Sequence, residues 1–343
     1  MKKLRIIVPM HITLVPPDTL DGYTDKEIAE WKTEYDVVRA LRDLGHEVRP
    51  LGLIDDLTEL RKAISDWKPH VAFNLLEEFH SVPTYDQHVV SYLELMRQPY
   101  TGCNPRGLLL AHDKELCKKL LTYHRIATPG FVVFPRNRAV KRPTKLKFPL
   151  IVKSATEDAS LGISQASIVA SDDKLKDRVA FVFDQLKSDA LVEEYIDGRE
   201  LYVGMMGNER LQTFPVWEMS FAGMPEGAPK IATRRVKWDE AYQKKYGIAT
   251  DAAADLSPET ERRIAAICKR VYRVLSISGY ARMDLRMTED GRLYILEANP
   301  NPNLSYGEDF SESAEKAGIA YGDLLQKIIN LGMNYRAAWA MQG

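Results

Sequence analysis

The sequence predicts an α/β protein, and three observations support this fold class. Strand and helix signals alternate through residues 1–106, which is typical of an open, mostly parallel sheet. Amphipathic helices and short apolar strands continue to alternate through the rest of the chain. Near the C-terminus, two strand-like segments flank Asp290-Gly291, a dipeptide that strongly favours a two-residue hairpin turn and therefore antiparallel pairing.

The N-terminal part begins with the apolar run Leu4–Pro9, which predicts the first strand. Apolar residues at helical spacing then predict one helix over 27–45, which ends at a glycine. The remaining expected elements of this part are a helix over 57–67 and strands over 46–53, 70–76 and Pro99–Gly102.

Further along, Ser257 is a good N-cap and Pro258 suits the first helical position, so a helix begins there. The other expected elements are helices over 108–125, 171–186 and 321–331, a strand over 147–155, two strands within 189–207, a loop-like stretch over 217–253, and hairpin strands over 280–287 and 292–299. This succession predicts domains over 1–106, 107–192 and 193–332, followed by a tail over 333–343.

Composition excludes several classes of protein. The formal net charge of −1 shows no basic excess that would indicate a nucleic-acid or membrane-surface partner. No run approaches the ~18–20 apolar residues of a membrane span, and the first apolar run lacks the cleavage site of a signal peptide. Cys103, Cys117 and Cys268 are few and widely spaced, which suits reduced thiols. We therefore expect a cytoplasmic protein.

The expected hairpin places four polar residues on one face. A two-residue turn pairs residues whose numbers sum to 581, so Asp284 lies opposite Glu297 and Arg282 lies opposite Asn299. Side chains alternate along a strand, so these four share a face, while Leu296 is expected to point the other way. Like charges opposite each other destabilise a ladder, and something positive must therefore compensate.

Two interpretations of this polar face remain open at this point. Two carboxylates and an amide oxygen are hard ligands of the kind that Mg²⁺ takes alongside nucleotide phosphates and water. The alternative is a surface ion pair between Arg282 and Asp284, which needs no ligand.

Charged residues elsewhere favour the nucleotide interpretation. Lys114 lies early in a helix and Lys153 ends an apolar strand. Glu193 and Glu194 end a further strand, and Glu200 begins the next one. Taken one at a time, these residues need no ligand, because lysines commonly extend to solvent from the ends of helices and strands and acids are common near turns. Together they supply the cations and carboxylates that a nucleotide between two sheets needs. The P-loop, dinucleotide-binding and kinase motifs are absent.

The ordered set of motifs resembles the ATP-grasp superfamily, and most closely the D-alanine–D-alanine ligase family. The motifs are Lys114, IVK ending at Lys153, ATEDASLGI, LVEEYIDGRE, ARMDL and LEANPNPN, within residues 70–332. The resemblance implies an ATP-grasp fold, in which two α+β subdomains clasp ATP, preceded by an open parallel-sheet domain.

The resemblance also implies roles for individual residues. Lys114, Lys153 and the lid residue Lys237 look like lysines that contact phosphates, and Ser160 lies in the flexible loop Ala155–Gly162 over the nucleotide. Glu193, Glu194, Tyr195 and Ile196 resemble the segment that meets adenine, Glu200 the ribose carboxylate, and Leu296 the apolar residue under the base. Asp284, Glu297 and Asn299 correspond to ligands of two Mg²⁺ ions, with Mn²⁺ as the alternative metal, and Arg282 to the arginine that steadies the transferring phosphoryl group.

The implied activity is that of an ADP-forming ligase. A substrate carboxylate takes up the γ-phosphoryl group of ATP, and an amine then displaces phosphate from the acyl phosphate. The expected partners are small-molecule carboxylates and amines, without nucleic acid or membrane. A homodimer is expected because the family usually forms one.

Departures from the family pattern fall on the amino-acid pockets. The family's N-terminal Glu-Val-Ser segment has no clean counterpart, although Glu27, Glu30 and Glu34 lie nearby. Glu308 and Asp309 occur where the family holds a substrate carboxylate. We therefore expect amino-acid or small-peptide substrates other than D-alanine plus D-alanine. The alternatives are a genuine D-alanine–D-alanine ligase and, in another class, an ATP-binding regulatory protein without ligase activity.

Overall fold

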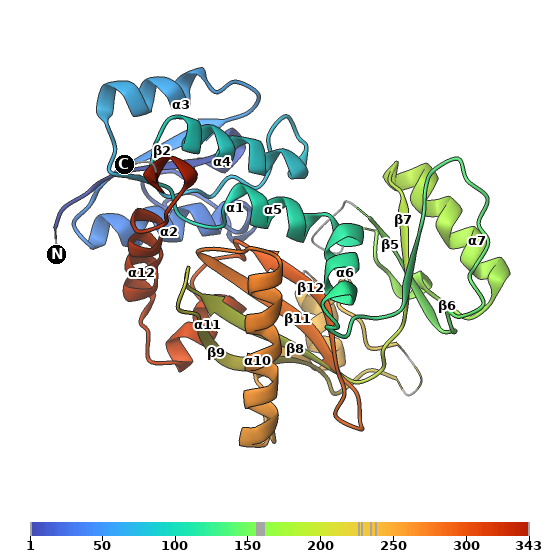
Figure 1. The fold of residues 1–343 in the computed structure, drawn as a ribbon. Helices are drawn as coiled ribbons and strands as arrows, with labels where there is room; N and C mark the ends of the chain where they lie inside the picture. Colours follow the sequence, from blue (N-terminus) through green and yellow to red (C-terminus); the bar gives the residue numbers. More distant parts are fainter. Residues whose placement is uncertain are drawn as a thin grey trace.

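The computed structural model describes residues 2–155, 162–225, 227, 229–233, 235–236 and 239–341 (Figure 1). The strands are β1 Arg5–His11, β2 Glu47–Leu53, β3 Val71–Ala72, β4 Phe131–Phe134, β5 Leu150–Ser154, β6 Ile168–Val169, β7 Ala190–Glu194, β8 Arg199–Met206, β9 Gln212–Phe221, β10 Ile248–Ala252, β11 Tyr280–Met287 and β12 Leu293–Pro300. The helices are α1 Asp25–Glu30, α2 Lys32–Asp43, α3 Thr58–Lys62, α4 Asp86–Leu95, α5 Pro105–His112, α6 Lys114–Tyr123, α7 Asp172–Phe181, α9 Glu240–Tyr246, α10 Pro258–Val274, α11 Asp309–Lys316 and α12 Tyr321–Met333.

The N-terminal sheet has the order β2-β1-β3 and is parallel, as the alternating pattern predicts. The expected strand at Pro99–Gly102 is reduced to a parallel bridge between Tyr100 and Ala72. Both faces of a parallel sheet need a cover. One cover includes the C-terminal helix α12, which lies beside α2 in Figure 1 and shares an apolar cluster with β1. A C-terminal helix therefore covers one face of the N-terminal sheet.

The middle sheet has the order β4-β7-β5-β6 and is antiparallel. Val152 of β5 and Val192 of β7 pack against α7 through Leu175. Because side chains alternate along each strand, Lys153 and Glu193 lie on the opposite face of this sheet. The sheet therefore has one apolar face under a helix and one charged face.

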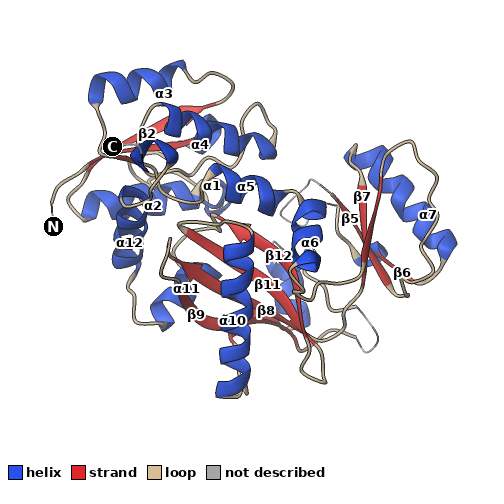
Figure 2. Cartoon of the chain, in the orientation of Figure 1, coloured by secondary structure: helices blue, strands red, loops and turns tan. Residues whose placement is uncertain are grey.

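The C-terminal sheet has the order β10-β9-β8-β11-β12 and is also antiparallel (Figure 2). Met283 and Leu285 of β11 pack with Ile264 and Val271 of α10, so this helix covers one face. The helix begins as expected, because the Ser257 side chain accepts a hydrogen bond from the Thr260 amide and Pro258 follows it. Polar residues of β8 and β11 lie on the other face.

Three expected elements are wrong in their extent. The single helix over 27–45 is divided at Trp31, whose backbone is not helical and whose ring packs on Tyr23 and Tyr35. The helix over 108–125 is divided at Asp113, which caps α6. The stretch over 217–253 is not a loop, because it contains the end of β9, all of α9 and all of β10.

The expected domain boundaries after residues 106 and 192 fall inside α5 and β7. A domain boundary inside a helix or a strand would separate residues that are hydrogen-bonded within the same unit of secondary structure. We propose instead a division before Pro105 and after Glu194, which keeps each element whole. No helix in the described part of the chain is long and apolar enough to cross a membrane.

Candidate active site between two sheets

The β11–β12 hairpin places the paired carboxylates where the sequence predicts them. Asp284 lies opposite Glu297, and Arg282 lies opposite Asn299. The expected two-residue turn, however, is wrong. Thr288 donates its amide to the carbonyl of Arg292 at 3.0 Å, so the loop has three residues. Near the turn, the residue numbers of each pair sum to 580, as for Leu285 with Ile295. A β-bulge between the Leu285 and Asp284 pairs returns this sum to 581 for the pairs farther from the turn.

The bulge residue is Leu296, which has no partner on β11. A bulge interrupts the alternation of side chains, so two consecutive residues can face the same side. Leu296 accordingly lines the cleft together with its neighbour Glu297, and the expectation that it points to the apolar face is wrong. The turn and the bulge shift the register in opposite directions, which is why the predicted pairing of the carboxylates holds.

A cleft separates the charged faces of the middle and C-terminal sheets. Its lining combines apolar side chains with charged ones from both sheets: Pro129, Ile151, Lys153, Ile163, Glu193, Glu194, Tyr195, Ile196, Glu200, Ile231, Ala232, Asp284, Arg286, Leu296 and Glu297. Most of the candidate nucleotide residues that lie in the described part of the chain therefore meet in one place.

Glu193 is the acid at the centre of a buried charge cluster. Its side chain is 1% exposed and forms ion pairs with Lys118 and, at 2.8 Å, with Lys153. Burial alone would raise the pKa of the Glu193 carboxyl, but the two ammonium groups lower it below its ordinary value. Burial would likewise lower the pKa of Lys153, and Glu193 raises it instead. Both groups are therefore held in their charged forms.

Arg282 holds Asp284 with two hydrogen bonds, from Nε at 2.8 Å and from Nη2 at 3.0 Å. Its Nη1 lies 3.9 Å from Asp309. Burial alone would lower the pKa of the Arg282 guanidinium, and Asp284 raises it above the ordinary value. Glu297 lies 3.4 Å from the ammonium of Lys114. Asp284 and Glu297 thus each have a cation of their own, which offsets the repulsion between two carboxylates that face each other across a ladder.

Glu200 is buried and both of its oxygens are engaged. Oε2 pairs with Nη2 of Arg286 at 2.5 Å, and Oε1 accepts from the Tyr202 hydroxyl at 2.9 Å. The expected role of Glu200 at a ribose would therefore require a hydroxyl to share or displace one of these partners.

The segment from Glu193 to Ile196 forms one wall of the cleft. The amides of Glu194 and Tyr195 donate to the carbonyls of Gly130 and Pro149, at 2.8 and 2.9 Å. The carbonyl of Ile196 accepts from Arg286 at 2.9 Å. These bonds fix the segment as a rigid connection between the two sheets.

Two expected site residues, Lys237 and Ser160, lie outside the described residues, as do Thr156 to Leu161 in the flexible loop. Their roles stay predictions.

The expected metal ligands fit a hard cation. Among the described residues no group of three or more His, Cys, Asp or Glu could hold a metal, so any site depends on two carboxylates and an amide. The amide nitrogen of Asn299 is buried without a hydrogen-bond partner in the described part of the chain. This amide can turn its oxygen toward a cation between Asp284 and Glu297, and phosphate oxygens would complete the shell.

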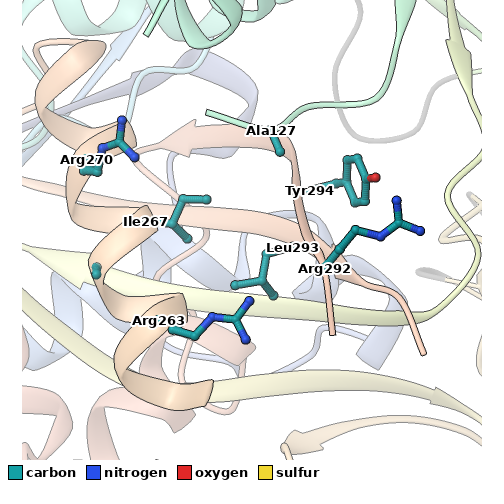
Figure 3. Close-up of a pocket in the computed structure, with 8 residues that line it drawn as sticks. Ala127, Arg263, Ile267, Arg270, Arg292, Leu293 and Tyr294 are labelled. Atoms are coloured by element: carbon teal, nitrogen blue, oxygen red, sulfur yellow. The ribbon is translucent and has the colours of Figure 1, made fainter. Parts of the chain in front are cut away.

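A second and more open groove lies on the opposite side of the C-terminal sheet (Figure 3). Arg263, Ile267 and Arg270 of α10 line it together with Arg292, which precedes β12, and Tyr294 of β12. Among the described residues that line it there is no carboxylate, so we do not place the chemistry there.

Two residues of the cleft were missed by sequence reasoning. Lys118 follows Lys114 by one helical turn, so the two lysines share a face of α6. Arg286 follows Asp284 by two residues and therefore shares its face of β11. Both spacings are visible in the sequence, but neither indicates which acid each cation meets.

Comparisons with known proteins agree with this geometry. The family model described as "D-ala D-ala ligase C-terminus" matches residues 120–330. D-alanine–D-alanine ligase of Aquifex aeolicus is 29% identical over 313 residues, covering 90% of this chain and 98% of that protein. An uncharacterized protein of Sinorhizobium fredii is 29% identical over 307 residues, covering 86% and 85%. The crystal structure of D-alanine–D-alanine ligase from Bacillus anthracis complexed with ATP superposes with a TM-score of 0.74 at 24% identity, covering 97% of this chain and 98% of that one.

The fold and the cleft define an ATP-grasp ligase, an enzyme that forms carbon–nitrogen bonds and releases ADP. The match over residues 120–330 spans more than half of the 343 residues. The chain belongs to the D-alanine–D-alanine ligase family, and the resemblance drawn from the motifs is confirmed.

Proposed function

We propose that this ligase binds ATP in the cleft between the middle and C-terminal sheets, activates a substrate carboxylate as an acyl phosphate, and transfers the acyl group to an amine. The observation that carries the proposal is the pairing of Asp284 with Glu297 inside a cleft that Lys153 also lines, with Arg282 hydrogen-bonded to Asp284. Facing carboxylates among cations are the arrangement that phosphoryl transfer needs.

The ammonium groups of Lys114 and Lys153 would offset charge on the phosphate oxygens. Glu297 and Glu193 hold these lysines in place, at 3.4 and 2.8 Å. Bound phosphates would take over part of each lysine's pairing, which leaves Glu297 available to a metal ion. Preorganised cations of this kind stabilise developing charge without reorganising during the reaction.

Asp284, Glu297 and Asn299 would hold Mg²⁺, which when bound supplies Lewis-acid charge to the β- and γ-phosphates. Arg282 remains anchored to Asp284 through Nε and Nη2. The N–H groups of Nη1 can then donate to the negatively charged oxygens of the transferring phosphoryl group.

The bonds exchanged in the two steps balance. A carboxylate oxygen of the first substrate bonds to the γ-phosphorus as the bond to the β–γ bridging oxygen breaks, and ADP leaves. The nitrogen of the second substrate then bonds to the acyl carbon, phosphate leaves, and the nitrogen gives up a proton. No covalent protein intermediate is needed.

D-alanine with D-alanine is the substrate pair that the comparisons favour, because the named relatives are D-alanine–D-alanine ligases. The different pair expected from the sequence finds no support in them. The regulatory alternative also lacks support, because Arg282 and Asn299 face each other on the same two strands that bring Asp284 and Glu297 into the cleft.

The test is a ligase assay on the purified chain with ATP, MgCl₂ and D-alanine, in which ADP, phosphate and the dipeptide are quantified. We expect Glu297→Gln to lower kcat by at least about 100-fold, since losing one charge-stabilising group costs roughly 3–4 kcal/mol of transition-state stabilisation. Arg263→Gln, in the groove of Figure 3, is the matched control and should leave kcat unchanged. Release of AMP and pyrophosphate would refute the mechanism.

A further inference from the structure

Arg286 of β11 is a buried cation that lines the cleft. Its side chain is 3% exposed, although an arginine usually extends its charged group into water. Burial of a guanidinium is strongly unfavourable unless acceptors replace the lost water. The acceptors around Arg286 therefore indicate its role.

The two terminal nitrogens of Arg286 contact three separate parts of the chain. Nη1 donates to the carbonyl of Ile196 at 2.9 Å and to the hydroxyl of Tyr195 at 3.2 Å. Nη2 donates to Oε2 of Glu200 at 2.5 Å and to the carbonyl of Lys230. One guanidinium thus joins a wall of the cleft, strand β8 and the segment that contains Lys230.

These contacts surround the part of the cleft where the base and sugar of a nucleotide are expected. Ile231 and Ala232 directly follow Lys230, and both line the cleft together with Ile196 and Glu200. The sequence assigns Ile196 to the adenine and Glu200 to the ribose. Arg286 itself has no expected role, yet it holds both of these residues.

Glu200 keeps acceptor capacity while Arg286 holds it. It lies directly opposite Arg286 across the β8–β11 ladder. Each carboxylate oxygen has two lone pairs, and Oε2 uses one for Arg286 while Oε1 uses one for the Tyr202 hydroxyl at 2.9 Å. A hydroxyl of a bound ligand can therefore share either oxygen. The planar fork of the arginine fixes the direction in which the carboxylate accepts.

The charge of Arg286 also suits a site for ATP. ATP carries several negative charges, so a carboxylate without a cation would repel it. The guanidinium offsets the charge of Glu200 at a distance of 2.5 Å. A paired carboxylate still forms charge-assisted hydrogen bonds, which are stronger than those of a neutral amide. The pair thus supplies a strong acceptor without adding net negative charge to the cleft.

We infer that Arg286 is a positioning residue that makes the enzyme selective for a ribonucleotide, because it holds Glu200 where the carboxylate accepts from the vicinal hydroxyls of the sugar. Through Lys230, the same side chain keeps Ile231 and Ala232 at this end of the cleft. This inference rests on the proposed function, because it concerns the same ATP site.

The experiment compares ATP with 2′-deoxy-ATP and 3′-deoxy-ATP in the ligase assay with D-alanine. For the wild type we expect kcat/KM with ATP to exceed that with at least one deoxynucleotide by about tenfold or more, because a hydrogen bond to a charged group is lost. Arg286→Lys keeps the charge, but one ammonium cannot span the partners of the fork. It should reduce the preference for ATP to less than about threefold, and the loss should appear in KM for ATP more than in kcat.

Arg199→Lys is the matched control. Arg199 also forms an arginine–glutamate pair in the same sheet, with bonds to Glu218 at 2.8 and 2.5 Å, and it donates to the Ala254 carbonyl at 2.7 Å. It is not among the described residues that line the cleft. This variant should keep the preference of the wild type for ribose. A merely structural role of Arg286 would impair all three nucleotides alike and leave their ratio unchanged.

A second variant guards against misfolding of the first. Arg286→Met combined with Glu200→Gln removes both buried charges together, so that neither is left without its partner. This double variant should bind ATP and the deoxynucleotides with similar affinity. A ribose preference that survives in it would overturn the inference.

Calorimetric titration of the three nucleotides with MgCl₂ into each protein provides a readout that does not depend on turnover. A preference for ATP in the wild type that is lost in Arg286→Lys supports the inference. The same preference in both proteins, or none in the wild type, overturns it. If the preference depends on Arg286 but D-alanine gives no dipeptide, the proposed reaction fails and the inference stands. If ATP does not bind at all, both fail.

Discussion

Lys118 is the side chain that joins the parts of the cleft. It is 3% exposed, and it meets Glu193 of the middle sheet, the Thr128 hydroxyl at 3.1 Å and the Leu296 carbonyl of the C-terminal sheet at 3.0 Å. A buried ammonium is tolerated only when its donors are satisfied, and these three groups accept from it. Because the acceptors belong to different elements, the ammonium fixes the two sheets relative to each other.

We expect Lys118→Met to lower the free energy of unfolding by roughly 3–5 kcal/mol, because Glu193 stays buried with only one of its two cations. Urea unfolding followed by circular dichroism measures the change. Lys119→Met is the matched control: that lysine is exposed and pairs with Glu115 of the same helix, so its loss should cost less than about 1 kcal/mol. Equal losses in the two variants would contradict the role of Lys118.

β12 is the element on which the site depends most. It is an edge strand of its sheet, and its bulge turns Leu296 into the cleft without moving Glu297 away from Asp284. Edge strands tolerate bulges because only one side of the ladder has to adapt. The same strand thus supplies an apolar surface and a charged group to one cleft.

Deleting Leu296 should leave a folded protein, because Ile295 already pairs with Leu285 and Glu297 with Asp284, and removal of the extra residue keeps both pairs. We expect a loss of roughly 1–3 kcal/mol in stability and at least a tenfold weaker ATP affinity, since the cleft loses an apolar wall. Calorimetry with ATP measures the affinity.

Deletion of Ala298 is the control for this prediction. Ala298 pairs regularly with Met283, so its removal turns Asn299 to the wrong face and should prevent folding. If both deletions unfold the protein equally, the bulge is not the adaptable point of the strand.

At the scale of the whole molecule, the described residues form three sheets, and C-terminal segments pack back against the N-terminal sheet. The C-terminal helix α12 packs beside α2, and the segment after β12 contacts the N-terminal part through Asn301, which accepts from the Cys103 amide at 2.8 Å. The middle sheet, in contrast, faces the C-terminal sheet across the cleft. A ligand that bridges the cleft should therefore add stability to the assembly.

We expect ATP with MgCl₂ to raise the melting temperature by several degrees, since a ligand at 100 times its Kd contributes about 2.7 kcal/mol. AMP should give a smaller shift, because it offers no β- or γ-phosphate to Lys114 and Lys153. Chelation of Mg²⁺ with EDTA should reduce the ATP shift. Scanning fluorimetry measures all three. A shift from AMP equal to that from ATP would place the phosphates away from these lysines.

The sequence by itself determined the features that propagate within one element. The hairpin register that faces Asp284 with Glu297, the cap of α10 at Ser257 and the charged ends of β5 and β7 follow from turn chemistry, capping and alternation. These rules act over a few residues, so they need no knowledge of the fold. Even there, the correct register resulted from a turn and a bulge that offset each other.

Tertiary structure alone decided which charges meet. The contacts of Lys118 with Glu193 and of Arg286 with Glu200 join residues 75 and 86 positions apart. The division of the helix at Trp31 is another such case, because aromatic packing outweighed helical periodicity. Such contacts depend on how elements pack and on which groups lose water together, and neither quantity is written in local sequence.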